Sequence, residues 1–192
     1  MSRRAKILAG VAGALAGAAA GAGAFWALTG PFTNPDQRVG AWTTNGAVGQ
    51  ELQGPYSRAR VALYGIWGLP PTETLYFVAT KDAAGAVLDR RCVYAVEGGA
   101  LPTRWWGVTL YRDGFYIANP ADRYSWTMTD TRIGPDGRWT LTLAPSGEGQ
   151  NRLTFGPQDG RFQLLLRLYQ PNPGVAEHRE TVPVPTVRKV AC

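Results

Sequence analysis

The sequence predicts a mainly β fold: an antiparallel β-sandwich or barrel that follows one N-terminal transmembrane or signal helix. Two observations predict it. From residue 72 onward, apolar and polar residues alternate with a period of two, in about seven or eight short segments separated by Gly, Pro and Asp turns. Ahead of them, residues 7–35 carry no charged side chain and follow Arg3, Arg4 and Lys6. Short strands at this spacing are typical of an antiparallel sandwich or barrel.

The N-terminal segment, residues 1–28, is predicted to be a membrane anchor or a signal. Residues 7–28 are long enough to cross a bilayer once, at about 1.5 Å per residue. The basic flank is expected to stay in the cytoplasm, which places the rest of the chain outside the inner membrane, in the periplasm or at the cell exterior. The alternative is a secreted or periplasmic protein cleaved near Ala24, where an A-x-A site ends. We favour the anchor because the apolar run continues through Trp26 and Leu28.

Three glycines of this segment suggest a contact between membrane helices. Gly13, Gly17 and Gly21 recur every four residues and therefore share one helical face. Small residues at this spacing let two membrane helices approach closely, so the face is a candidate for self-association. A segment rich in Ala and Gly also produces such spacings by chance, and that explanation stays open.

Charge argues against a nucleic-acid partner. The net charge is +6, and half of it comes from Arg3, Arg4 and Lys6. The remaining basic residues are scattered, whereas a protein that binds nucleic acid shows a clustered basic stripe. We therefore expect no nucleic-acid partner.

The two cysteines, Cys92 and Cys192, are predicted to form a disulfide if the domain is exported. The bond would close a loop of about 100 residues, which the chain-entropy model values at roughly 4–5 kcal/mol. Two unpaired thiols, one of them buried, are the alternative.

Composition divides the rest of the chain in two. Residues 29–55 are rich in Gly, Pro and Asn and are predicted to be a linker. Residues 56–192 are predicted to be the β-sandwich domain, with one short leading helix that begins at Pro55 and ends at Gly65 or Gly68. Helical spacing is shown by Tyr56, Ala59, Leu63 and Ile66.

The strands are predicted from alternation and from the turns between them. Asp113-Gly114 and Pro135-Asp136-Gly137 are strong turn signals. In the strand over residues 162–169, one face carries Phe162, Leu164, Leu166 and Leu168, and the other carries Gln163, Leu165, Arg167 and Tyr169. The predicted strands are 74–80, 87–96, 104–112, 115–118, 124–133, 138–144, 162–169 and 187–191.

Catalytic motifs are missing from the sequence. His178, the one histidine, and two distant cysteines cannot assemble a typical zinc site. There is no G-x-S-x-G and no phosphate-binding glycine motif. We therefore predict no catalytic residue, no metal and no cofactor. Asp122 with Glu73 is the carboxylate pair to consider for a hydrolase, which would need two carboxylates about 5–10 Å apart.

Residues 104–126 concentrate aromatic, Arg and Asn side chains. One face of the predicted strand carries Trp106, Val108 and Leu110, and the other carries Trp105, Thr109 and Tyr111. If the first face is core, the second presents large rings to solvent or to a groove, where rings stack on sugars or lipid head groups. A few polar groups that converge in an aromatic-lined cleft are typical of a ligand site.

The candidate ligand-binding residues are Arg104, Trp105, Tyr111, Asn119, Asp122, Arg123, Tyr124, Arg167 and Tyr169. A structural explanation competes: the tryptophans fill the core, and Arg123 pairs with a carboxylate such as Asp122 or Glu73. The sequence does not show whether Arg104, Arg123 and Arg167 converge.

Three runs of residues resemble one known family. ALPTRWWGVTLYRDGFYIANPADRYSW (100–126), FQLLLRLYQP (162–171) and PVPTVRKVAC (183–192) together resemble the domain of unknown function 1214 (DUF1214) family. The resemblance spans about residues 70–192, and the lead-in over residues 40–77 is similar to the short, membrane-tethered bacterial members. It implies a β-sandwich of jelly-roll character, and no catalytic residues can be carried over from it. We expect this chain to lack the additional upstream domain of the longer members.

Together these observations favour an exported, membrane-tethered β-sandwich that serves as a non-catalytic binding or scaffold module of the cell envelope, with a glycan or a protein as its partner. The alternative is a carboxylate-dependent hydrolase or isomerase acting on a sugar or lactone.

Overall fold

The computed structural model describes residues 2–29, 37–45, 68–119, 121–156 and 160–192. The short helix predicted to begin at Pro55 lies outside the described residues.

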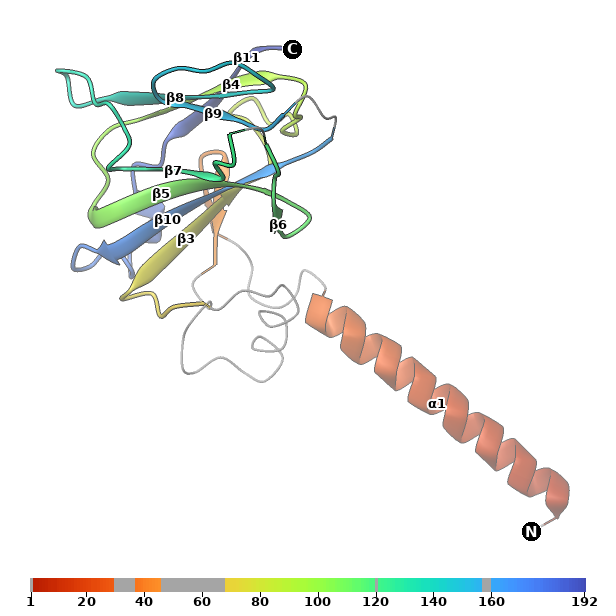
Figure 1. Cartoon of the computed structure of the whole chain (residues 1–192). Helices are drawn as coiled ribbons and strands as arrows, with labels where there is room; N and C mark the ends of the chain where they lie inside the picture. The colour runs from red at the N-terminus through yellow and green to blue at the C-terminus, as the bar shows by residue number, and fades with distance from the viewer. Residues whose placement is uncertain (1, 30–36, 46–67, 120, 157–159) are drawn as a thin grey trace.

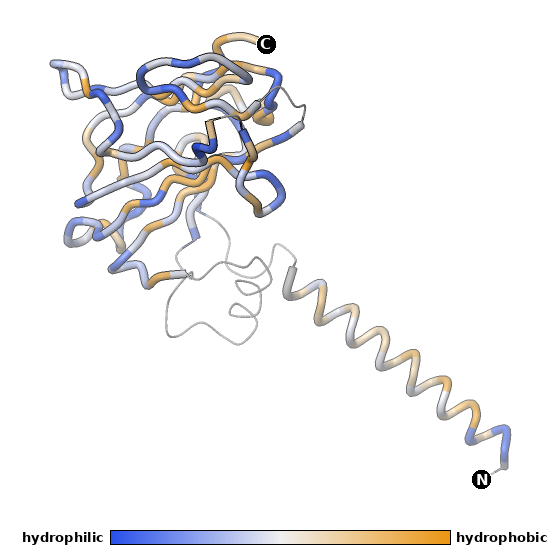
Figure 2. The backbone as a smooth tube through the Cα atoms, viewed as in Figure 1, coloured by the Kyte–Doolittle hydropathy of each residue, from blue (hydrophilic) through white to orange (hydrophobic). Residues whose placement is uncertain are grey.

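The N-terminal segment forms one uninterrupted helix, α1 (Arg3–Thr29). Its part Arg3–Ala27 is long and apolar enough to span a membrane or to be a signal sequence, and Figure 2 shows apolar residues along most of its length. Large apolar side chains on it are uncovered, with Leu15 66% and Phe25 63% exposed. Such apolar surface is unfavourable in water and favourable in lipid.

The glycine face of α1 is open in this structure. A methyl group added at Gly13, Gly17 or Gly21 meets nothing within 4 Å. Self-association through this face stays a prediction.

Within the described residues, eleven strands form two sheets that pack against each other (Figure 1). The larger sheet has the order β1-β2-β3-β10-β5-β6, and β7 also pairs with β5. Its strands are β1 (Gln37–Val39), β2 (Trp42–Thr44), β3 (Thr74–Ala79), β5 (Thr103–Arg112), β6 (Phe115–Tyr116), β7 (Ser125–Thr127) and β10 (Gln163–Pro171).

The smaller sheet has the order β11-β4-β8-β9. Its strands are β4 (Val93–Gly98), β8 (Trp139–Ala144), β9 (Arg152–Thr154) and β11 (Thr186–Ala191), and a short 3-10 helix, η1 (Arg179–Thr181), precedes β11. All pairings between these strands are antiparallel except that of β8 with β9. The described strands form two open sheets and no closed barrel, so the predicted mainly β, antiparallel-rich sandwich is confirmed, while its jelly-roll character stays a prediction.

The core lies between the two sheets and is supplied by alternate residues of each strand. On β10, the predicted stripe of Leu164, Leu166 and Leu168 is fully buried. Trp106 of β5 stacks on Trp139 of β8 with 4.5 Å between ring centroids, so aromatic packing joins the two sheets. The inner face of β10 is therefore core, and Arg167 and Tyr169 lie on its outer face.

Part of the predicted linker belongs to the larger sheet. β1 and β2 form a hairpin, and β2 pairs with β3. The Trp42 side chain is fully buried, and its indole N–H donates a hydrogen bond to the Pro185 carbonyl at 2.6 Å. The prediction of a linker over residues 29–55 is therefore wrong for residues 37–44. Three-residue strands are too short to show a period, and Gly40, at φ +60°, is the turn between them.

Other strand predictions differ at their boundaries. β4 begins at Val93, because residues 81–89 make only isolated bridges. β7 ends at Thr127, where a turn begins, and β9 has no counterpart among the predicted strands.

The predicted disulfide is present. Cys92, directly before β4, is bonded to Cys192 at the end of the chain, across a sequence separation of 100. The bond ties the end of β11 to the start of its neighbour β4. Disulfides persist mainly in oxidising compartments.

Candidate ligand-binding cleft

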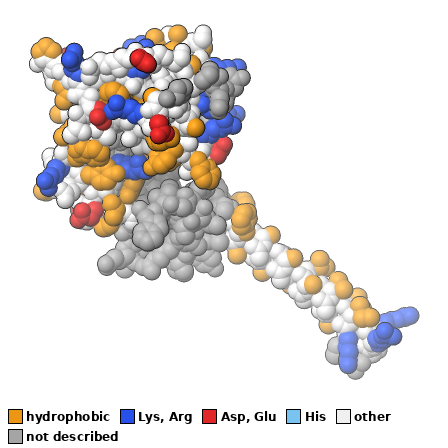
Figure 3. Space-filling view, viewed as in Figure 1, with side chains coloured by type: hydrophobic (Ala, Val, Ile, Leu, Met, Phe, Trp, Pro, Cys, Tyr) orange, Lys and Arg blue, Asp and Glu red, His pale blue; other side chains and the backbone are white. Residues whose placement is uncertain are grey.

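The outer face of the larger sheet carries a cleft of about 550 Å³ over β5, β7 and β10, called the outer cleft below. Where β5, β6 and β10 lie in Figure 1, Figure 3 shows hydrophobic side chains beside both acidic and basic ones. The lining residues are Trp105, Gly107, Thr109, Tyr116, Asp122, Arg123, Tyr124, Ser125, Thr127, Asp130, Arg167 and Tyr169.

Strand register builds the floor of the outer cleft. Gly107 of β5 lies opposite Arg167 of β10 on one side and Thr127 of β7 on the other. A Cβ at Gly107 would lie 3.6 Å from the Trp105 ring and 3.7 Å from the Thr127 side chain, so the Trp105 ring packs directly over Gly107. One end of the cleft is closed by Trp105 and Tyr169, which lie opposite each other with ring centroids 5.2 Å apart.

The other end of the outer cleft is a stack of three tyrosines. Tyr116 stacks between Tyr111 and Tyr124, at centroid distances of 5.0 and 5.2 Å. The Asp113-Gly114 turn has positive φ at both residues, as a tight two-residue hairpin requires, and it returns Tyr116 to a place opposite Tyr111. The Tyr111 hydroxyl raises the pKa of Tyr116. Tyr116 is therefore a neutral phenol at physiological pH.

Asn119 shapes the segment between β6 and β7 and does not line the cleft. Its Oδ1 accepts hydrogen bonds from the backbone N–H groups of Ala121 and Arg123, both at 3.2 Å. Its Nδ2 donates to the carbonyls of Ile117 and Arg123, at 3.1 and 2.9 Å. These bonds direct the side chains that follow Asn119 over the cleft. Asn119 is thus a positioning residue for the segment.

Asp122 and Tyr124 form a hydrogen-bonded pair at the rim. The Tyr124 hydroxyl donates to the Asp122 carboxylate, which raises the pKa of Tyr124. Asp122 has φ +49°, a left-handed conformation that Asp tolerates better than most residues.

Arg123 is an ion-paired arginine. Its Nη2 lies 3.0 Å from Asp130 Oδ1, and its guanidinium carbon lies 3.8 Å from the centroid of the Trp126 ring. Asp130 also accepts hydrogen bonds from the Thr127 hydroxyl, at 2.5 Å, and from the Thr127 backbone N–H. The Thr127 hydroxyl and then Arg123 lower the pKa of Asp130. A carboxylate partner for Arg123 was expected, but Asp130 is that partner, not Asp122 or Glu73.

Arg167 is held differently, by neutral groups. Its Nη1 donates to the Thr109 hydroxyl at 3.0 Å, and its Nη2 donates to the Tyr111 hydroxyl at 2.8 Å. Across the described ranges, no carboxylate lies within ion-pair distance of Arg167. The half-buried guanidinium of Arg167 therefore has no counter-ion among those residues.

Most of the predicted ligand residues come together. The outer cleft is lined by Trp105, Asp122, Arg123, Tyr124, Arg167 and Tyr169. Tyr111 supports it through Tyr116 and Arg167, whereas Arg104 is exposed outside it and donates to Gln170 at 3.0 Å. Arg123 and Arg167 thus line one cleft without Arg104. That these residues bind a ligand stays a prediction.

Several lining residues were not among the predicted ligand residues. Thr109 was placed on the face of Trp105 but not in the site, and Gly107 shares that face, so alternation alone could have identified both. Tyr116 and Asp130 could not be found that way, because a two-residue strand and a turn place them.

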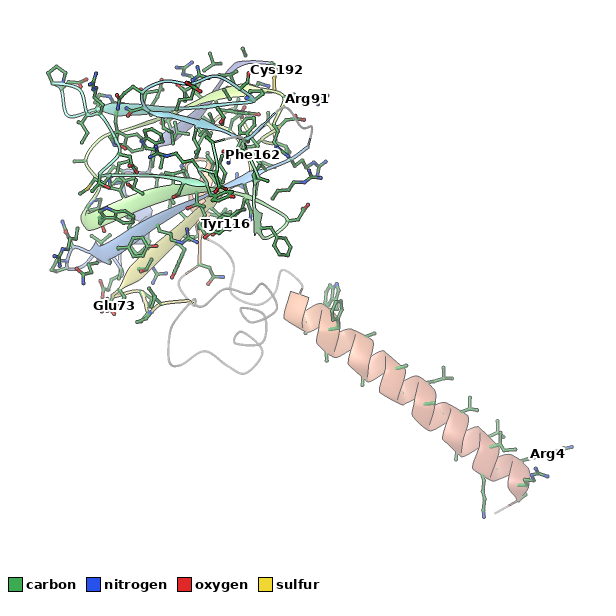
Figure 4. All side chains as sticks on the ribbon, viewed as in Figure 1. Arg4, Glu73, Arg91, Tyr116, Phe162 and Cys192 are labelled. Atoms are coloured by element: carbon green, nitrogen blue, oxygen red, sulfur yellow. A yellow bond between two sulfur atoms is a disulfide. The ribbon has the colours of Figure 1, made fainter. Side chains whose placement is uncertain are left out.

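The predicted carboxylate pair does not form in the outer cleft. Glu73 is exposed at the start of β3 and does not line the cleft, and Figure 4 shows it apart from Tyr116. Asp122 shares the cleft with Asp130 instead. The lowered pKa of Asp130 keeps it ionised at neutral pH, so it is not suited to donate a proton. Among the described residues, no group of three or more His, Cys, Asp and Glu could hold a metal ion.

Two solved structures are similar to this chain. The VPA0106 protein from Vibrio parahaemolyticus has a TM-score of 0.60 at 23% identity, over 72% of this chain and 36% of its own. A putative uncharacterized protein from Burkholderia cenocepacia has a TM-score of 0.39 at 17% identity, over 62% of this chain and 29% of its own. The similarity thus spans about a third of each of those chains. The first likeness shows the fold alone, and no argument rests on the second.

No curated protein matches the sequence. A family described as protein of unknown function (DUF1214) matches residues 73–173. That range includes β3, β5, β7 and β10 and every residue that lines the outer cleft. The chain therefore belongs to the DUF1214 family, as the resemblance predicted.

Proposed function

We propose that the protein is a membrane-tethered, non-catalytic binding module of the cell envelope, whose outer cleft takes a glycan. The observation that carries the proposal is the outer cleft itself, with aromatic rings at both ends and polar side chains between them. Its volume of about 550 Å³ lies within the usual range for small-ligand sites, roughly 300–1,000 Å³.

The location rests on α1 and on the disulfide. A long apolar helix behind Arg3, Arg4 and Lys6 would keep the N-terminus in the cytoplasm and the β-sandwich in the periplasm or at the cell exterior. The Cys92–Cys192 bond suits such an oxidising compartment. Cleavage near Ala24 would leave the domain in the same compartment without its tether.

The lining of the outer cleft suits sugars. The apolar faces of sugar rings stack on flat aromatic rings, and Trp105 and Tyr169 form such a wall. Sugar hydroxyls need donors and acceptors, which Ser125, Thr127 and Asp122 supply. A protein partner is the alternative, but protein interfaces are mostly broader surfaces than one concave cleft.

Catalysis is the second candidate, because Asp122 and Asp130 line one cleft. A glycoside hydrolase needs one carboxyl group with a raised pKa to act as the acid. Asp130 has a lowered pKa and is bound to Arg123 and Thr127. The contacts of Asp130 therefore favour binding over hydrolysis.

The proposal predicts that a substitution in the outer cleft weakens sugar binding but has little effect on the stability of the fold. The full-length protein in lipid nanodiscs is titrated calorimetrically with a panel of neutral and acidic envelope oligosaccharides. Trp105→Ala is expected to weaken binding at least tenfold, because the stacking wall loses its larger ring, and to shift the melting temperature by only a few degrees. The matched control is Arg104→Ala on the same strand, outside the cleft, which is expected to bind as the wild type does.

Three outcomes would contradict the proposal. They are no binding of any panel member by the wild type, unchanged binding by Trp105→Ala, and release of shorter sugars during incubation. The last would favour the hydrolase.

A further inference from the structure

The outer cleft holds two arginines with different electrostatic environments. Arg123 is neutralised by Asp130 at 3.0 Å and covered on one side by Trp126. Among the residues that the structure describes, Arg167 donates hydrogen bonds only to the hydroxyls of Thr109 and Tyr111. The two side chains line the same cleft, so the difference between them is local.

The hydrogen bonds of Arg167 orient its guanidinium without neutralising it. An arginine stays charged at any physiological pH, and a half-buried charge without a counter-ion is unfavourable. Two hydroxyl acceptors fix two of its nitrogens and leave the positive charge uncompensated within the described part of the chain. A preorganised cation of this kind is a binding group for an anion.

The position of Arg167 indicates where the anion would lie. Arg167 is opposite Gly107, and Trp105, two residues before Gly107 on the same face of β5, lays its ring over that glycine. A sugar ring packed on Trp105 would therefore have its ring substituents within reach of Arg167. An exocyclic group of the sugar is the natural site for a charge.

We propose that Arg167 binds a carboxylate borne on a sugar ring, so that the outer cleft selects an acidic glycan of the uronic acid type. The inference rests on the proposed function and names its substrate class. A planar carboxylate matches the planar donor fork of arginine. Asp122 and Asp130 line the same cleft and disfavour a dense polyanion or a phosphate dianion, which carries nearly two charges. A single carboxylate on an otherwise neutral sugar best fits an arginine that has no counter-ion among the described residues, in a cleft that two acidic residues also line.

The test compares three tetrasaccharides that differ at one sugar: glucuronic acid, glucose, or glucose 6-phosphate. The full-length protein in nanodiscs of neutral lipid is titrated calorimetrically with each at low ionic strength. The glucuronic acid form is expected to bind at least tenfold more tightly than the glucose form. The preference is expected to shrink with added salt, since part of it is electrostatic.

Variants assign the preference to Arg167. Arg167→Gln is expected to abolish the preference for the acid, so that the affinities of the variant for the glucuronic acid and glucose forms agree within about threefold. Arg167→Lys keeps the positive charge but loses the planar donor geometry of the guanidinium, and it is expected to retain part of the preference for the acid. The matched control is Arg188→Gln, which removes a positive charge from the outer face of the other sheet and is expected to leave the affinities for both sugars unchanged.

A second variant covers a failure of Arg167→Gln to fold. Tyr111→Phe keeps the ring that stacks on Tyr116 but removes the hydroxyl that accepts from Arg167. It is expected to reduce the preference for the acid severalfold.

The failures are distinguishable. Equal affinity for the acidic and neutral sugars would overturn the inference and leave the proposed glycan-binding function in place. Tighter binding of the phosphate would overturn the assignment to a carboxylate. A preference for the acid that survives in both Arg167→Gln and Tyr111→Phe would place the anion elsewhere. No binding of these sugars or of the envelope panel would overturn the proposed function as well.

Discussion

The outer faces of the two sheets follow the same alternation but have different properties. On the smaller sheet, Glu97 and Arg188 form an ion pair at 2.6 Å beside the short side chains of Thr140 and Thr142. On the larger sheet, the outer face carries large rings, a cleft and Arg167, which is hydrogen-bonded to neutral hydroxyls.

The difference arises from what borders each face. The segment between β6 and β7 and the turn after β7 bring Asp122, Arg123 and Asp130 to the border of the larger sheet. The outer face of the smaller sheet instead carries short side chains and an ion pair. Alternation therefore decides which residues are outside the core, and neighbouring loops decide whether that outside face becomes a binding site.

The largest expected effect is a loss of stability at the smaller sheet that leaves sugar binding at the larger sheet intact. Replacing both Cys92 and Cys192 by Ser removes the bond that ties β11 to β4 on the smaller sheet. The chain-entropy model predicts a loss of about 4–5 kcal/mol, and strain in the native bond would lower that figure. The measurement is denaturant unfolding of the full-length protein.

Reduced wild-type protein is the control and is expected to unfold like the double variant. At denaturant concentrations below its unfolding transition, the variant is expected to bind sugars as the wild type does, because neither cysteine lines the outer cleft. Unchanged stability, or loss of binding in the folded variant, would contradict the separation of the two regions.

The next effect compares the two faces of β10 with one substitution. Leu166→Ala removes a fully buried side chain from the core and is expected to cost about 2–5 kcal/mol. Leu165→Ala makes the same change on the outer face, where the side chain is only partly buried, and is expected to cost less than half as much. Urea unfolding measures both. Equal losses would show that the outer face is packed like the core.

The smallest effect tests the ion pair on the smaller sheet. Arg188 lowers the pKa of Glu97 below its usual value. A carboxylate with a lowered folded-state pKa contributes stability above its unfolded pKa, and loses it as the pH falls through the folded value. Glu97→Gln is therefore expected to melt below the wild type at neutral pH, and the difference is expected to shrink as the pH falls below the unfolded value of about 4.3.

Thermal melts across that pH range provide the measurement, with Glu73→Gln as the control at an exposed position outside the pair. A difference that persists undiminished in acid would show that the Glu97 side chain acts through packing rather than through its charge.

Much of the fold was predictable because period-two alternation is a local property. It identified the buried stripe of β10 and placed Arg167 and Tyr169 on the opposite face. The Asp113-Gly114 turn was predictable for the same reason, since positive φ favours those residues. Residues 37–44 were mistaken for linker because their strands are too short to show a period.

The candidate site was predictable in part. Trp105 and Arg123 stood out by residue type, whereas Asp130 did not, because a turn after β7 brings it to Arg123. Gly107 carries no chemistry of its own and matters only because strand register sets it opposite Arg167.

By itself, the sequence determined the apolar N-terminal helix, the mainly β class and the inner and outer faces of the long strands, since each follows from residues near one another in the chain. Only the tertiary structure decided that Arg123 and Arg167 share one cleft without Arg104, and that Arg123 is ion-paired whereas Arg167 has no carboxylate partner in the described part of the chain. Those outcomes depend on strand register and on turns that bring distant residues together, and no local pattern encodes either.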